Sequence, residues 1–208
     1  GKVVKVDRVE WVYIPDPATA MNALVNGEVD LWETPAVDMV PLLKTNADIE
    51  IKVIDPLGTQ GWLRPNHLHP PFDNPKARQA LLYAVNQEEY LQAIVGDPAL
   101  YKVCAAYFIC GTPNETSIGT EALSSVNKEK AKQLLKEAGY KGEKIILMQP
   151  TDIPVLNNAS LVTAQMLRDI GMDVEVQAMD WSTLTSRRAE KKKPSEGGWN
   201  VFHTYSTG

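Results

Sequence analysis

The sequence has few cysteines and histidines and no long apolar run. Only two of its 208 residues are cysteine and three are histidine, so a metal centre built from such ligands has few residues to draw on. No stretch approaches the ~20 consecutive apolar residues that a membrane-spanning helix needs. No charged start followed by a short apolar segment marks a secretory signal. These absences argue against a membrane-spanning protein and against a precursor form.

An excess of basic residues is also missing. Lys and Arg number 21 against 26 Asp and Glu, giving a net charge of −5, so we expect no nucleic-acid partner. The composition is that of a soluble globular protein, with 44% hydrophobic residues. A chain of 208 residues can bury one sizeable core or be one lobe of something larger. We expect a single domain over residues 1–208, and the start at Gly1 favours an excised domain.

The motifs of common catalytic sites are absent. We find no nucleophile elbow, no phosphate-binding glycine loop and no HExxH pattern, and the scattered carboxylates show no acid–base pair. His67 and His69 lie two residues apart and would face the same side of an extended segment, but a third ligand would have to come from the distant His203. We therefore expect no enzyme, no cofactor and no metal. A small metal-dependent enzyme using His67 and His69 stays as an alternative.

Helix and strand patterns alternate along the chain. Period-two alternation of apolar residues predicts strands, and apolar stripes between capping residues predict helices. The strands are expected near residues 9–14, 28–32, 49–53, 61–66, 144–148, 174–176 and 199–204, and the helices near residues 16–26, 37–43, 75–85, 87–95, 127–138, 157–170 and 181–189. This order favours an α/β layered domain with a mixed sheet.

The stretch from Gly61 to Val95 carries the strongest local signals. Its strand stops at Pro70-Pro71, because proline has no N–H for ladder pairing. Asn74 is an N-cap with Pro75 as the first helical residue. Asn86 caps the following helix, with Glu89 at the capping-box position. We expect Leu81, Leu82 and Val85 to form the buried stripe of the first helix, and Leu161 to lie on the buried side of a later one.

A longer pattern runs through the same region. Asn66 is followed by Pro70-Pro71-Phe72-Asp73, then by Ala77-Arg78-Gln79-Ala80-Leu81, and then by Ala84-Val85-Asn86. Three further segments extend it, namely IPDPATAMNALVNGEVDLWE at residues 14–33, AKQLLKEAGY at 131–140 and QMLRDIGMDVEVQAMDWSTL at 165–184. Together these segments resemble the extracytoplasmic solute-binding proteins of family 5, the dipeptide- and oligopeptide-binding components of ABC importers.

This resemblance implies a periplasmic-binding-protein type II-like lobe, a mixed sheet flanked by helices. The chain would be the second, inserted lobe of a bilobal protein, with the strands at 9–14 and 199–204 at the interlobe hinge. The parent would capture a peptide or similar small solute between the lobes and deliver it to an ABC permease. It would act in the periplasm, or outside the cytoplasm as a membrane-anchored lipoprotein. Its partners are the solute, the other lobe and the permease. A stand-alone α/β interaction module remains an alternative.

Aromatic residues at strand ends are candidates for ligand contact. Trp32, Trp62, Trp181, Trp199 and Tyr205 lie near predicted strand ends or strand–helix junctions, where the clefts of α/β domains are built and aromatic rings can stack on a ligand. Arg64, beside Trp62, is either exposed or aimed at an anionic group. The expected ligand-binding residues are Trp62, Arg64, Asn66, Glu33, His203, Tyr205 and Ser206.

The resemblance breaks at the end of the sequence. In the best-known peptide binders, an acid that pairs with the ligand's amino group follows the last strand. Here that region reads Tyr205-Ser206-Thr207-Gly208, with no acid before the sequence stops. A peptide is therefore only one of the expected solutes, beside the nickel chelates, haem, sugars and opines that family members carry.

Cys104 and Cys110 flank a five-residue segment in YKVCAAYFICGTP. A turn could bring them within bridging distance, and the alternative is two buried free thiols. The resemblance to an exported family favours the disulfide, because an oxidising compartment preserves it. The bridge would also pin the irregular excursion from Gly96 to Ser125.

Overall fold

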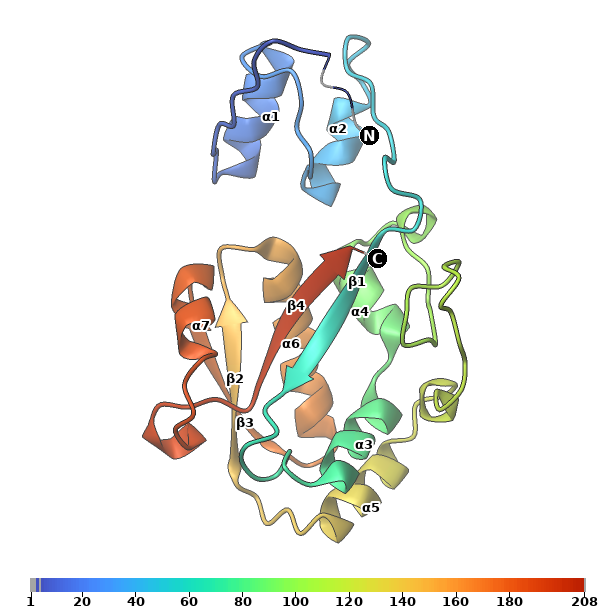
Figure 1. Ribbon diagram of the computed structural model, residues 1–208, viewed down its shortest axis with the longest axis vertical. Coiled ribbons are helices and arrows are strands. Elements are labelled where there is room, and N and C mark those ends of the chain that lie inside the picture. Colours follow the sequence, from blue (N-terminus) through green and yellow to red (C-terminus); the bar gives the residue numbers. More distant parts are fainter. Residues whose placement is uncertain (1–2, 4, 208) are drawn as a thin grey trace. The chain divides into compact units, whose positions relative to one another are not determined.

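The computed structural model describes residue 3 and residues 5–207. Gly1 and Gly208, which entered the expectations about the chain ends, lie outside the described residues, as do Lys2 and Val4. The chain divides into two compact units, residues 1–54 and residues 55–208, and Figure 1 labels the helices and strands of each. Within the described residues, no helix combines the length and the apolar character needed to cross a bilayer.

The first unit contains short helices. They are α1 (Pro17–Val25), the 3₁₀ turn η1 (Val37–Met39) and α2 (Val40–Leu43). The carboxylate of Asp16 accepts a hydrogen bond from the Thr19 N–H at 2.8 Å and so caps α1. These helices confirm the two predicted near residues 16–26 and 37–43.

The three strands predicted for the first unit are wrong. Residues 9–14, 28–32 and 49–53 are irregular, and the described part of the chain offers them no ladder partner. Alternating side chains suit a pleated strand, but the strand itself requires hydrogen bonds to a neighbour. Without that neighbour, Trp11 and Tyr13 remain largely exposed.

The second unit is built on a four-stranded mixed sheet. The strands are β1 (Thr59–Pro65), β2 (Lys144–Pro150), β3 (Asp173–Met179) and β4 (Val201–Thr207), in the order β1-β4-β2-β3. β1 runs antiparallel to β4, whereas β2 is parallel to both β3 and β4. This arrangement confirms the predicted α/β class and all four strands expected in this unit, with β4 beginning two residues later than expected.

Four of the five α-helices of the second unit begin where they were predicted. They are α3 (Pro75–Ala84), α4 (Gln87–Ile94), α5 (Lys128–Glu137), α6 (Pro154–Asp169) and α7 (Trp181–Arg187), with 3₁₀ turns η2 (Pro98–Leu100), η3 (Glu121–Leu123) and η4 (Pro194–Glu196). Asn74, Asn86 and Asn127 each accept a hydrogen bond from an N–H in the first turn. α6 starts three residues earlier than expected, with Pro154 in its first turn.

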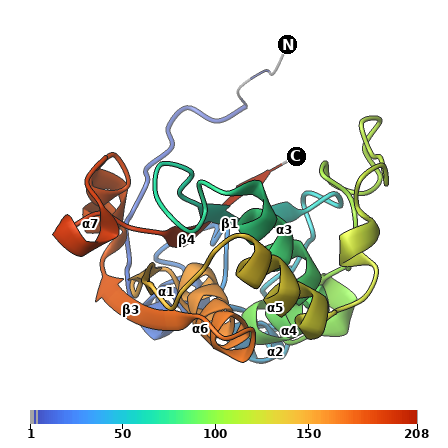
Figure 2. The same ribbon diagram turned by 90° about the horizontal axis from the view of Figure 1, so that it is seen from below.

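The sheet has a helix on one side and several on the other. α3, α5 and α6 pack their apolar residues against Ile145, Leu147 and Val201 to form the main core. α7 contributes Leu184 to a smaller cluster with Met148, Trp199 and Phe202. In Figure 2, α7 lies apart from the group α3–α6. The sheet is therefore the middle layer of the unit.

Two leucines expected in the core lie at the surface. Leu82 and Leu161 are exposed, so their assignment to buried stripes was wrong, whereas their neighbours Leu81 and Ser160 are buried. Adjacent residues in a helix point about 100° apart, so a run of apolar residues cannot turn every member toward one core.

Cys104 and Cys110 form a disulfide, which confirms the favoured interpretation. The surrounding stretch from Gly96 to Ser125 is irregular except for η2 and η3. The expected long surface excursion is therefore present, and the bridge closes a small loop within it.

Candidate functional site

The pairing of β1 with β4 sorts their side chains onto two faces. Trp62 lies opposite Thr204, Leu63 opposite His203, and Arg64 opposite Phe202. Residues directly opposite in an antiparallel pair project from the same face, and successive residues alternate. Two surfaces result. One carries Gln60, Trp62, Arg64, Thr204 and Ser206, here called the open face, and it continues into Phe202, which is buried in the cluster with α7. The other, the helix-covered face, carries Leu63, Val201 and His203, with Tyr205 exposed at its end.

The open face presents an aromatic ring beside a cation. The Trp62 side chain is 39% exposed, and the Arg64 guanidinium carbon lies 5.9 Å from the centroid of its ring. The Trp62 indole N–H donates a hydrogen bond to Gln60 Oε1 at 3.0 Å, which fixes the ring orientation. Arg64 is exposed and has no carboxylate partner within residues 5–207. A guanidinium of this kind can bind an anion while the ring stacks on an apolar group.

His203 belongs to a buried polar chain behind the sheet. Its Nε2 lies 2.5 Å from Thr163 Oγ1 on α6, and Thr163 Oγ1 lies 2.6 Å from the Tyr90 hydroxyl on α4. Burial lowers the pKa of His203 to about 4, against the opposing effect of a hydrogen bond with the Trp62 backbone. Burial likewise raises the pKa of Tyr90 to about 12. Both groups are therefore neutral at pH 7, and together they join β4 to two helices.

Asn66 is also engaged within the protein. Its Nδ2 donates to the Trp199 carbonyl at 3.0 Å, and its Oδ1 accepts from the Leu68 N–H at 3.0 Å. Its own N–H donates to the Asn200 carbonyl. The buried side chain thus fastens the turn after β1 to the segment before β4.

The other predicted ligand-binding residues lie apart from one another. Tyr205 is exposed and projects from the same face as His203, whereas half-buried Ser206 belongs to the open face. Glu33 is an exposed residue of the first unit. Of the predicted set, the structure brings together Trp62, Arg64 and Ser206 on one surface.

The remaining tryptophans have mainly structural surroundings. Trp199 is buried, with its ring 5.0 Å from that of Phe202, and its indole N–H donates to the Arg188 carbonyl. Trp181 is half-buried against the same cluster. Trp32 is a half-buried residue of the first unit. Trp62 alone of these tryptophans lies on the open face.

Gln60 on this face, and the two loop residues Tyr107 and Phe108 that it leads to, were not singled out by the sequence analysis. The Gln60 amide N–H donates to the Tyr107 carbonyl at 3.3 Å. Tyr107 and Phe108 are exposed and contact each other edge to face, 5.1 Å between ring centroids. Both aromatic residues lie between the two cysteines. Two adjacent aromatic residues inside a disulfide loop were the signal that could have identified them.

The histidines proposed as alternative metal ligands do not converge. His67 is exposed, and His69 Nε2 lies 2.9 Å from the Lys191 carbonyl. His203 is enclosed in the chain with Thr163. Among the described residues, no group of three His, Cys, Asp or Glu side chains is placed to hold a metal ion.

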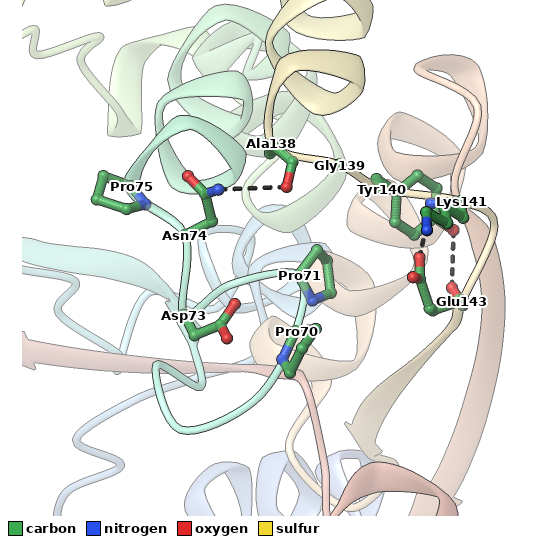
Figure 3. Close-up of a pocket in the computed structure, with 10 residues that line it drawn as sticks. All are labelled: Pro70, Pro71, Asp73, Asn74, Pro75, Ala138, Gly139, Tyr140, Lys141 and Glu143. Atoms are coloured by element: carbon green, nitrogen blue, oxygen red, sulfur yellow. Dashed lines mark hydrogen bonds between the residues drawn. The ribbon is translucent and has the colours of Figure 1, made fainter.

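A hollow of about 500 Å³ lies at the Pro70-Pro71 corner beyond the end of β1. Figure 3 shows Pro70, Pro71 and Asp73 on one side and Tyr140 with Glu143 on the other. Its polar groups are mostly engaged internally: Asn74 Nδ2 donates to the Ala138 carbonyl, and the Tyr140 hydroxyl donates to the Glu143 carbonyl. None of the predicted ligand-binding residues lines this hollow.

Comparisons with known proteins agree with this fold. Residues 1–205 match the family described as bacterial extracellular solute-binding proteins, family 5 Middle. The chain is 40% identical to the probable peptide ABC transporter periplasmic-binding protein y4tO of Sinorhizobium fredii, and 30% identical to the glutathione-binding protein GsiB of Escherichia coli K12. These alignments cover 98% and 96% of this chain, but only 39% and 38% of those proteins.

A solved structure shows the same fold at lower identity. The substrate-binding protein CtaP of Listeria monocytogenes superposes with a TM-score of 0.76 at 23% identity, over 92% of this chain and 38% of that one. The fold defines the class as an α/β domain with a mixed sheet between layers of helices. More particularly, the chain belongs to the family 5 bacterial extracellular solute-binding proteins. It spans about two fifths of the length of the curated relatives that it matches.

Proposed function

We propose that the chain works as one lobe of a bilobal binding protein that captures a peptide or similar small solute for an ABC importer. The observation that carries this proposal is the open face, where Trp62 and the unpaired cation of Arg64 lie side by side on β1. The family and the named functions of the relatives, peptide transport and glutathione binding, support it. Peptides and glutathione both carry carboxylates that a guanidinium binds well.

The second lobe would come from the part of the binding protein that this chain does not span. The relatives are more than twice as long as the matched region. Residues 9–14 alternate like a strand yet have no ladder partner among the described residues, and Trp11 and Tyr13 are exposed. Such a segment would gain both hydrogen bonds and burial by pairing with a further lobe. We therefore assign residues 9–14 and β4 to the hinge.

Capture would follow from closure of the two lobes around the solute. A solute that contacts both lobes stabilises the closed state by its differential affinity for that state. One lobe alone supplies only part of those contacts, so the isolated chain should bind weakly. The closed, loaded protein would then be the form that docks on the membrane permease.

This function requires no bond breaking, and we propose a binding protein without enzymatic activity. It would act outside the cytoplasm, in the periplasm or anchored there as a lipoprotein. The Cys104–Cys110 disulfide supports such an oxidising location.

Titration calorimetry tests the proposal. The complete binding protein and the 208-residue chain are each titrated with di- to pentapeptides, glutathione and nickel–histidine chelates. We expect micromolar or tighter binding of one solute class by the complete protein and little by the single chain. Equally tight binding by the single chain, or turnover of a bound solute, would contradict the one-lobe function.

A further inference from the structure

The loop closed by the Cys104–Cys110 disulfide combines a firm base with an exposed aromatic tip. At the base, the Gln87 side chain of α4 makes both hydrogen bonds with the Cys104 backbone: its Nε2 donates to the carbonyl at 3.0 Å, and its Oε1 accepts from the N–H at 2.9 Å. The Cys110 N–H points back to Cys104 Sγ at 3.1 Å. The loop is thus held to a helix at one end and closed on itself by the bridge.

The tip leaves apolar surface in water. Tyr107 is 78% exposed and Phe108 is 47% exposed, although each could stabilise the fold if buried. Two adjacent exposed aromatic side chains on a fastened loop contribute little to folding. Exposed adjacent apolar side chains of this kind are typical of a ligand-binding surface.

A single side chain connects this tip to the open face. Gln60 accepts a hydrogen bond from the Trp62 indole through Oε1 at 3.0 Å and donates through Nε2 to the Tyr107 carbonyl at 3.3 Å. The position of the Trp62 ring and the position of the loop tip are therefore set by the same amide. This amide thus links the loop that carries Tyr107 and Phe108 to the strand that carries Trp62.

The charge beside Trp62 forms no ion pair within residues 5–207. Arg78 and Arg187 donate to backbone carbonyls of the fold, whereas the polar interaction of the Arg64 guanidinium found among the described residues is that with the Trp62 ring. An exposed guanidinium next to aromatic rings matches a solute that carries a carboxylate beside a flat apolar group.

We propose that the Cys104–Cys110 loop is a second wall of the solute site and selects solutes with a flat apolar group next to a carboxylate. The carboxylate binds Arg64, and the flat group packs against Trp62 and the aromatic tip. This inference rests on the proposed function of the chain as a solute-binding lobe, and it assigns to that lobe a selectivity for aromatic over small side chains.

Calorimetry of the complete binding protein with three probes tests both parts of the site. The probes are the dipeptide Ala-Phe, its C-terminal amide, and Ala-Ala. The wild type should prefer Ala-Phe to each of the others. The double variant Tyr107→Ala/Phe108→Ala should lower the affinity for Ala-Phe about tenfold and that for Ala-Ala less than about twofold, because only the former has a ring to stack. Arg64→Gln should remove the preference for Ala-Phe over its amide.

Ile118→Ala is the matched control, because Ile118 is an exposed apolar residue of the same excursion outside the disulfide loop. It should leave all three affinities unchanged. Reduction of the wild type with dithiothreitol should reproduce the loss of preference for Ala-Phe expected of the double variant. The disulfide then no longer closes the loop that carries Tyr107 and Phe108. Circular dichroism melting confirms that each variant is folded.

The possible results distinguish a failure of the proposed second wall from a failure of the proposed solute-binding function. Binding of Ala-Phe that the loop variant leaves unchanged, or equal losses for Ala-Phe and Ala-Ala, would overturn the second wall while the proposed function stands. Tight binding of an uncharged sugar in place of the peptides would overturn the carboxylate selectivity. A wild-type protein that binds no solute of any class would overturn the proposed function and this inference together.

Discussion

Trp62 and Leu63 are neighbours in β1, yet they face opposite surroundings. Trp62 shares its side of the strand with Arg64 and with solvent, whereas Leu63 points into the main core beside His203. The helix-covered face therefore contributes the main core, while Trp62 and Arg64 on the open face are exposed, as the proposed solute site requires. One strand can contribute to both the core and the proposed site because its side chains alternate. Mutations on the two faces should consequently have different effects.

The largest effect should come from the core behind the sheet. Leu167 on α6 is fully buried, and Leu167→Ala should lower the free energy of unfolding by about 2–5 kcal/mol, because it removes buried methyl groups and leaves a cavity. Leu161→Ala is the control on the same helix, at an exposed position. It should change the stability by less than about 0.5 kcal/mol. Urea denaturation measures both, and similar losses would refute the assignment of faces.

The helix-covered face should also make stability depend on pH. The folded pKa of His203 is about 4, below the ordinary value of 6.5. Between these values, the unfolded chain binds a proton that the folded chain does not, so stability falls as the pH drops from 6.5 toward 4. The loss should amount to about 3 kcal/mol once the pH lies below both values.

His203→Gln removes this titration and serves as the comparison. The difference in unfolding free energy between wild type and variant should shrink as the pH falls through this window. Carboxylates with lowered pKa values, such as Asp169 and Asp180, weaken the fold at still lower pH in both proteins. A constant difference between pH 7 and pH 4 would show that His203 titrates normally, against its burial.

Asn66 allows a smaller test at the end of the same strand. Asn66→Ala leaves the buried Trp199 carbonyl and the Leu68 N–H without their partner, which should cost about 1–3 kcal/mol of folding stability. Because the side chain is turned inward, solute affinity of the folded protein should stay within about twofold. Gln60→Ala is the converse control, with affinity reduced and stability kept. Calorimetric affinity that falls for Asn66→Ala at unchanged stability would make Asn66 a ligand residue.

The local signals in the sequence were the ones that predicted the fold well. Asn74, Asn86 and Asn127 cap their helices as expected, because capping depends on a few adjacent residues. The alternation of apolar residues at 9–14 led to a wrong strand prediction. A strand needs a hydrogen-bonded partner, and no local sequence pattern supplies one. β1 and β4 formed as strands because they pair with each other across most of the chain.

The candidate site could be predicted only in part for the same reason. Trp62 and Arg64 were predicted from their types and their position on a strand, and the structure places them side by side. That His203 faces the helices follows from the register of β4 against β1, which involves residues about 140 positions apart in the sequence. The place of Tyr107 and Phe108 depends on the disulfide and on Gln60, neither of which has a periodic signature.

The most direct test of the central claim uses the two neighbours in β1. Trp62→Ala and Leu63→Ala are compared in the complete binding protein by urea denaturation and by calorimetry with the preferred solute. We predict that Trp62→Ala lowers affinity about tenfold at nearly unchanged stability. Leu63→Ala should lower stability by about 1–3 kcal/mol while the folded protein keeps its affinity. Wild-type affinity in Trp62→Ala, or a selective loss of affinity in Leu63→Ala, would contradict the division of the sheet into a recognising face and a stabilising face.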